Sequence, residues 1–208
     1  FNKHKNHLDL GKVDLNTVQD GNEDSKILRD AVSSHLVNLL GIEQEIIEFL
    51  DHHTCHAYYA YFAAPFSKVR KIVLTYDSIG DYLNQTVWVG ENGKMELVCK
   101  TDQNDLGRIY KMTTLILGMK PNEHEYKVMG LAPYAKEKYS QEVVDKVYKR
   151  LLKVDGNLIV HNDRPQDMYN YLLESTRPYR FDNIAKGLQT WAEELVIELC
   201  QNLVKNLS

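Results

Sequence analysis

Apolar positions along the first part of the chain predict a helix, a short strand and a second helix. In residues 25–40 they recur every three or four residues and are followed by Gly41, so we expect an amphipathic helix that ends there. Residues 46–50 form a short apolar run that is typical of a buried strand. Residues 58–64 return to helical spacing and stop at Pro65, a residue that cannot continue a helix.

The middle of the chain has the pattern of an antiparallel sheet. We expect three strands, at residues 69–76, 83–90 and 94–100. The last two are joined through Asn92-Gly93, a dipeptide that strongly favours a hairpin turn. We expect the turn after the first of these strands to place two carboxylates, Asp77 and Asp81, at the end of the central strand.

From Asp105 onward the pattern becomes mostly helical, and we expect one mixed α/β (α+β) domain over residues 1–208. Residues 1–24 are polar and predicted to be irregular, residues 25–134 form the core that carries the candidate sites, and residues 135–208 are mostly helical. The expected elements of the second half are helices at 105–117, 142–154, 166–174 and 183–207, a separate segment at 125–134, and a short strand at 157–160.

Composition and charge exclude two classes of partner. The net charge of −4 and the pI near 6.1 give no basic footprint for nucleic acid. No apolar run approaches the ~20 residues that a membrane helix needs, so we expect no membrane association. The three cysteines are widely spaced and odd in number, which argues against a disulfide framework and favours a reducing, cytoplasmic location.

The chemistry of the chain centres on the sequence Asp-His-His-Thr-Cys-His-Ala, which begins at Asp51. His52 and His56 are four residues apart, so on a helix that begins here they project from one face of its first turn. Two imidazoles so placed can bind one metal ion, with an acidic residue from elsewhere, such as Asp77, completing the set. The alternative is a histidine cluster that is solvated or satisfied within the core. His53 points away from the pair, and we leave open a supporting, a substrate-facing and a purely structural role.

Four segments, taken in order, resemble one protein family. They are the histidine motif through Ala-Ala-Pro-Phe, the turn Tyr-Asp-Ser-Ile-Gly-Asp, the stretch Leu-Gly-x-x-Tyr through Glu-Tyr-Lys-Val-Met-Gly-Leu-Ala-Pro-Tyr, and a closing helix from Ile184. Together they resemble the O-carbamoyltransferases of the nodulation-protein U and cephalosporin-carbamoyltransferase type. The resemblance runs from about Asp51 to the end of the chain, and the stretch around Lys127 is its most specific part.

The resemblance implies an actin/Hsp70-like ATPase fold (ASKHA) and a carbamoyltransferase activity. It implies transfer of a carbamoyl group from carbamoyl phosphate, through a carbamoyl-adenylate made with ATP, to a hydroxyl of a sugar or antibiotic-like small molecule. The implied cofactor is a divalent metal, with Fe(II) favoured and Zn(II) as the alternative. The implied partner is an adenylate-forming C-terminal domain of the same protein, and a homodimer is compatible with the family.

The resemblance also implies roles for particular residues. His52, His56 and Asp77 would bind the metal, although Asp77 alone is equally typical of a turn residue that bonds its own backbone. Asp81 would be the general base for the acceptor hydroxyl or else a plain loop carboxylate, and His53 is the second candidate for a catalytic role. Most family members have glycine where this chain has Ser78, which weakens the expectation of a close backbone approach there.

The remaining implied residues concern the nucleotide. Gly80 would let the backbone approach a phosphate or carbamoyl group closely. Glu125, Lys127 and Gly130 would contact the nucleotide or carbamoyl-adenylate, with Glu125 reaching a ribose hydroxyl and Lys127 a phosphate. The alternative for Lys127 is a solvated side chain at a helix end.

Two further functional readings stay open. One is a non-catalytic nucleotide- or metal-binding regulatory domain of the same fold, and the other is a metal-dependent hydrolase, which leaves residues 125–134 unexplained. The resemblance further implies family segments before Phe1 and after Ser208, so we expect the chain to be an incomplete part that does not turn over alone.

Overall fold

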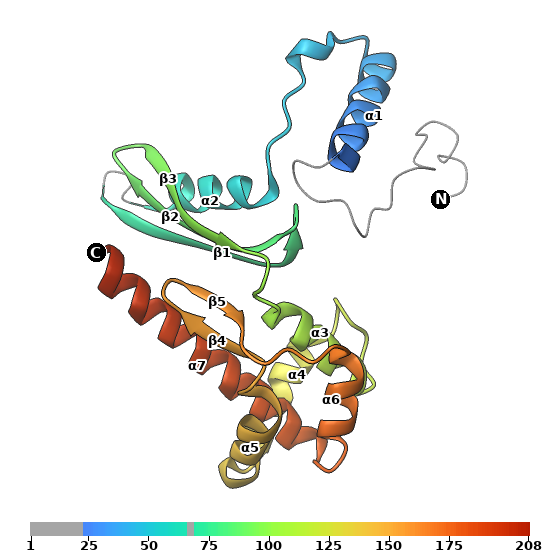
Figure 1. Cartoon of the computed structure of the whole chain (residues 1–208), viewed down its shortest axis with the longest axis vertical. Helices are drawn as coiled ribbons and strands as arrows, with labels where there is room; N and C mark the ends of the chain where they lie inside the picture. Colours follow the sequence, from blue (N-terminus) through green and yellow to red (C-terminus); the bar gives the residue numbers. More distant parts are fainter. Residues whose placement is uncertain (1–22, 66–68) are drawn as a thin grey trace.

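The computed structural model describes residues 23–65 and 69–208 of the chain (Figure 1). Helix α1, Glu23–Leu40, stands apart from the other elements and ends as expected at Gly41, whose φ is 66°. A short 3₁₀ turn, Gln44–Ile46, and an irregular segment join it to helix α2, His52–Ala63. Residues 1–22, predicted to be irregular, and Phe66 of the histidine motif lie outside the described residues.

The predicted strand at 46–50 is wrong. This segment is irregular after the 3₁₀ turn, and its apolar side chains Ile46, Phe49 and Leu50 are exposed. A strand is stable only when its backbone pairs with a neighbour, and no described strand lies beside this segment. The apolar run therefore reflects surface that faces away from the core.

Three antiparallel strands form the main sheet in the order β1–β2–β3. Their bounds are β1, Lys71–Gly80, β2, Leu83–Glu91, and β3, Lys94–Thr101. The Asn92-Gly93 hairpin is confirmed, because both residues have the positive φ, 50° and 80°, that this tight turn requires. The central strand is β2, so the expectation that Asp77 and Asp81 end the central strand is wrong: Asp77 belongs to the edge strand β1, and Asp81 follows it.

Pairing between β1 and β2 is interrupted where the candidate site lies. The register is regular from Lys71 opposite Gly90 to Tyr76 opposite Gln85, and it resumes only at Gly80 opposite Leu83. The intervening residues 77–79 are therefore freed from the ladder. This local irregularity lets the Asp77 side chain leave the sheet and reach α2.

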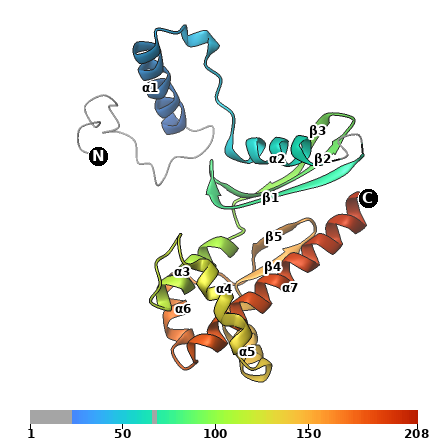
Figure 2. The same ribbon diagram turned by 180° about the vertical axis from the view of Figure 1, so that it is seen from behind.

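The sheet separates two apolar clusters (Figures 1 and 2). On the α2 side, Ala57 and Tyr61 pack against Val73 and Trp88. The helix lies so close that a Cβ on Gly90 would come within 2.4 Å of the Tyr61 ring. The opposite face, through Val87, belongs to the larger cluster formed with the C-terminal half.

The C-terminal half wraps helices around a small hairpin and the long helix α7. Its elements are α3, Leu106–Ile116, α4, Glu125–Leu131, α5, Glu137–Val143, β4, Leu152–Asp155, β5, Leu158–His161, α6, Met168–Thr176, and α7, Phe181–Leu207. The predicted helix 142–154 is only partly correct. After α5 a π-helical turn, Val144–Tyr148, follows, and the chain then turns into strand β4. Most of its apolar residues are buried on both sides of this change, so their helical spacing gives no sign of where the helix ends.

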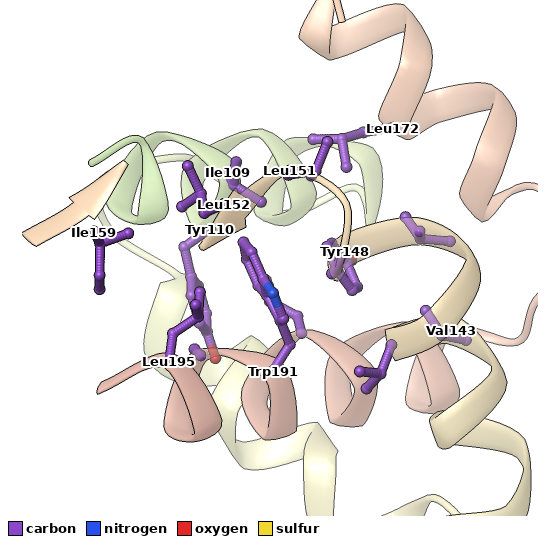
Figure 3. Close-up of a cluster of buried hydrophobic side chains, with 14 of the residues drawn as sticks. Ile109, Tyr110, Val143, Tyr148, Leu151, Leu152, Ile159, Leu172, Trp191 and Leu195 are labelled. Atoms are coloured by element: carbon purple, nitrogen blue, oxygen red, sulfur yellow. The ribbon is translucent and has the colours of Figure 1, made fainter. Parts of the chain in front are cut away.

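The large core is centred on α7 (Figure 3). The rings of Tyr148 and Trp191 stack with centroids 5.4 Å apart, and Ile109 and Leu195 pack near them. This cluster holds α3 and α4 in place below the irregular end of β1. No helix among the described residues is long and apolar enough to cross a membrane.

Candidate metal centre

Helix α2 begins where the histidine motif predicts. Asp51 is in an extended conformation, and its carboxylate accepts a hydrogen bond of 2.8 Å from the Thr54 backbone N–H. This is an N-cap, and it starts the helix at His52. His52 and His56 consequently lie one turn apart on the same face, with ring centroids 4.4 Å apart.

The carboxylate of Asp77 completes a group of three converging ligand atoms. Its Oδ2 lies 2.6 Å from His52 Nε2 and 3.8 Å from His56 Nε2, and the two Nε2 atoms are 3.0 Å apart. Ligand atoms held about 2.1 Å from one metal ion are separated by similar distances, about 3.0–3.4 Å. The three side chains are partly exposed, so an ion or a ligand can enter from solvent.

The chemistry of these atoms fits a divalent cation. Two imidazole nitrogens and a carboxylate oxygen offer lone pairs to the same small volume, and one proton between them cannot satisfy all three. Burial by itself would raise the pKa of Asp77, but hydrogen bonds from His52 and the Ser78 amide, with the charges of His52 and His56, bring this pKa below its usual value. The carboxylate is thus held ionised, as a metal ligand must be.

Asp77 makes both the local turn bond and the contact with the histidines that the sequence analysis considered. Its Oδ1 accepts a hydrogen bond of 2.6 Å from the backbone N–H of Ser78, as a turn residue does. Its Oδ2 is the atom directed at the histidines. The local bond therefore orients the carboxylate toward α2.

Gly80 and Asp81 both contact His52, the first at its ring and the second at its backbone. A Cβ on Gly80 would lie 2.1 Å from His52 Cδ2, so the close approach at this glycine is made by the imidazole ring. The backbone N–H of His52 donates to Asp81 Oδ2 at 2.6 Å. Asp81, whose φ is 45°, also lines a cavity of ≈400 Å³.

His53 follows His52 on the first turn of α2, with the two ring centroids 5.4 Å apart, and is 1% exposed. Its Nε2 is 3.0 Å from the carbonyl oxygen of Leu83, so this nitrogen donates. Its Nδ1 then accepts from the Thr75 hydroxyl at 2.7 Å. The Thr75 oxygen lies 2.6 Å from that of Thr86, which accepts from Trp88 Nε1 at 2.7 Å. In this series of hydrogen bonds, every donor has one acceptor.

Because both nitrogens of His53 are used inside the core, a substrate-facing position does not fit the structure. The hydrogen-bond chain instead fastens the first turn of α2 to β1 and β2, and Thr75 and Thr86 are cross-strand partners. His53 thereby supports the first turn of α2, where its ring lies edge-on to that of His52. No sequence pattern predicts this hydrogen-bond partnership, because Thr75 and Thr86 are ordinary strand residues until their register is known.

A second cavity, of ≈420 Å³, extends from Asp77 toward the C-terminal half. Tyr76, Asp77 and Ser78 form one side, and helices α3, α4 and α7 form the other, where the lining residues are mostly apolar. Its walls approach closely, because a Cβ on Gly107 would lie 3.4 Å from the Ser78 Cα. The cavity therefore extends from Asp77 to α4.

Of the three residues expected at the nucleotide, the structure brings only Glu125 to this cavity. Glu125 and Met129 are four residues apart on α4 and line it together, whereas Lys127 and Gly130 are exposed and do not. The Lys127 ammonium lies 5.8 Å from the Tyr126 ring centroid, which corresponds to the solvated alternative. A Cβ on Gly130 would meet no heavy atom within 4 Å.

Comparison with known proteins identifies the family. A family model described as Carbamoyltransferase N-terminus matches residues 11–208. The chain belongs to this carbamoyltransferase family. Nodulation protein NolO of Bradyrhizobium diazoefficiens is 34% identical over 116 residues, which are 55% of this chain and 20% of that protein. Nodulation protein NolNO of Sinorhizobium fredii is 31% identical over 124 residues, 59% of this chain and 18% of that protein.

Other members of the family have no described activity in their names. An uncharacterised protein of Synechocystis sp. is 29% identical over 176 residues, covering 76% of this chain and 28% of that protein. This carbamoyltransferase N-terminal chain thus spans less than a third of the length of the curated relatives it matches. An activity of the longer relatives is therefore only a proposal for this chain.

Proposed function

We propose that this chain carries the transfer site of a metal-assisted O-carbamoyltransferase. The observation that carries the proposal is the convergence of His52 Nε2, His56 Nε2 and Asp77 Oδ2 within 3.8 Å of one another. These three side chains would hold a divalent ion, Fe(II) or Zn(II), through nitrogen and oxygen donors that suit both metals. When bound, the ion would supply Lewis-acid polarisation of a carbonyl and a lower pKa for a nearby hydroxyl.

The residues around this site suit the two halves of the reaction. In carbamoyl transfer, the acceptor oxygen bonds to the carbamoyl carbon, the bond from that carbon to the adenylate breaks, and the hydroxyl proton passes to a base. Asp81 is our candidate for the base, because one carboxylate oxygen is bonded to the His52 amide while the residue faces a cavity. The mostly apolar cavity beside Asp77 suits the carbamoyl-adenylate, with Glu125 at its far end placed for a ribose hydroxyl.

We propose the following fold, co-substrates and acceptor for the longer protein that contains this chain. The chain would form part of an actin/Hsp70-like ATPase fold, with carbamoyl phosphate and ATP used by an adenylate-forming domain of the longer protein. The acceptor would be a hydroxyl-bearing sugar or antibiotic-like molecule. The cysteines Cys55, Cys99 and Cys200 are free, which suits a reducing compartment, and we propose a cytoplasmic location.

The proposal is tested in a full-length protein that contains this domain. We expect His56→Ala to abolish ATP- and carbamoyl-phosphate-dependent carbamoylation of an acceptor while adenylate formation, followed as pyrophosphate release, continues. His35→Ala is the matched control, because it removes a histidine from α1, which stands apart from the site. Carbamoyl transfer at the wild-type rate in His56→Ala would remove the site from the reaction and favour a non-catalytic domain.

A further inference from the structure

A second cluster of charged side chains surrounds a buried carboxylate on the far side of the β1–β2 turn. Asp105 stands immediately before α3, and its side chain is 4% exposed. It accepts a hydrogen bond of 2.8 Å from His161 Nε2 on β5. Two guanidinium groups join it, Arg108 through Nη1 at 3.3 Å and Arg164 through Nε at 3.2 Å.

One buried carboxylate cannot use all the donors of these two arginines. Each guanidinium has five N–H groups in a planar fork. Arg108 and Arg164 each give Asp105 a single nitrogen, and within residues 23–65 and 69–208 their other nitrogens make no hydrogen bond or ion pair. Asp105 therefore orients the arginines without saturating them, and the charge of one guanidinium is left over.

These free donors lie beside an open space. Arg108, Arg164 and His161 line the cavity of ≈400 Å³ that also reaches Asp81, and Lys100 adds a further ammonium. The volume falls within the range of small-molecule sites, about 300–1,000 Å³. Oriented guanidinium forks in such a cavity match the planar or tetrahedral oxygens of a carboxylate or phosphate.

The same cavity also carries acceptors. The carboxylate residues Asp81 and Asp102 also line it, together with Asn84, whose side-chain amide is bonded to the Asp102 carbonyl and the Asn104 backbone N–H. A bare anion would be repelled by these carboxylates, whereas a hydroxyl can donate to them. The lining thus favours one ligand that combines an anionic group for the arginines with hydroxyl groups for the carboxylates.

We propose that this cavity binds a hydroxylated oxyanion, of the class of sugar phosphates and sugar acids, with the anionic group at Arg108 and Arg164. The hydroxyl end then lies at Asp81, whose other neighbour is the backbone of His52 in the candidate metal centre. As a description of the acceptor this rests on the proposed function, but binding itself requires neither a metal nor turnover.

The test is a calorimetric and NMR titration of the metal-free chain with glucose 6-phosphate, and separately with glucose and with inorganic phosphate. We expect glucose 6-phosphate to bind more tightly than either half, and to shift the amide signals of Asp81 and Lys100. Arg164→Gln should weaken its binding by about tenfold or more, since it removes a charged donor. The control is Arg177→Gln, which removes a guanidinium that pairs with Glu174 elsewhere, and it should leave binding unchanged.

Several outcomes would overturn the proposal. Absence of binding at millimolar glucose 6-phosphate would leave the cluster as an ion-pair clamp between α3 and β5. Equal binding by Arg164→Gln and Arg177→Gln would show that the ligand binds outside this cavity. Binding of phosphate as tight as that of the sugar phosphate would show that the hydroxyl groups make no contribution. If Arg164→Gln fails to fold, Arg164→Lys retains the charge without the fork and should still weaken binding. None of these outcomes depends on the metal centre, so failure here and failure of the proposed function are distinguishable.

Discussion

Substitution of Gly80 by alanine tests the metal centre without removing any ligand. The new Cβ would lie 2.1 Å from Cδ2 and 2.8 Å from Nε2 of His52. To restore an ordinary contact of 3.4 Å, the ring has to retreat by about 1.3 Å. Metal sites tolerate errors of only about 0.2 Å in ligand position, so His52 leaves the ligand set.

We therefore expect Gly80→Ala to lose metal affinity by about 100-fold or more, the upper end of the effect of losing a ligand's support. Its free energy of unfolding should fall by only about 1–3 kcal/mol, the usual cost of overpacking, because the partly exposed His52 ring can swing into solvent. Zinc titration calorimetry gives the affinity, and urea unfolding of the metal-free protein gives the stability.

The matched control is Gly130→Ala on α4, where no heavy atom lies within 4 Å of the new Cβ. This helical substitution should raise stability by about 0.5–1 kcal/mol and leave metal binding unchanged. Wild-type zinc affinity and stoichiometry in Gly80→Ala would refute the reasoning, because the ring of His52 would then not be a ligand in the position described.

Three other predictions concern the framework and its pH dependence. Gln85→Ala should lower the free energy of unfolding, measured in urea, by about 2–5 kcal/mol. The buried Oε1 of Gln85 accepts from the Asn104 side chain and the Ile159 amide, and both donors would be left unpaired. A change below about 1 kcal/mol would contradict these contacts. Trp191→Ala should cost about 3–5 kcal/mol, since it removes the ring stacked on Tyr148, and an unchanged urea midpoint would count against the core described. Burial raises the pKa of Tyr148, so the contribution of this residue to the stability of the folded state should be constant below about pH 10 and fall above it, where the unfolded chain loses this proton; Tyr148→Phe should reduce the alkaline fall in stability, and an identical alkaline profile would oppose the assignment.

Local signals predicted those parts of the structure that depend on local conformation. The Asn92-Gly93 turn was predictable because two successive positive φ angles favour these residue types. The histidine face of α2 was predictable from a spacing of four residues and the preceding Asp51 cap. Asp77 was predicted as the third ligand from the family motif.

Features that depend on distant partners were not predictable in this way. The apolar run at 46–50 has the composition of a strand but no strand beside it among the described elements. The buried position of His53 depends on the register that sets Thr75 opposite Thr86. Likewise, the cluster around Asp105 unites residues more than fifty positions apart, through the hydrogen bond to His161. Hydrophobic spacing carries no information on such pairings.

The central claim, that three side chains form one metal site, is tested most directly by metal stoichiometry. Zinc and anaerobic Fe(II) titrations would compare the wild type with His52→Ala/His56→Ala and with Asp77→Asn at neutral pH, where free imidazoles are largely unprotonated. We expect one ion per chain in the wild type, none in the double variant, and weakened binding in Asp77→Asn. Retention of one tightly bound ion by the double variant, or no binding by the wild type, would contradict it.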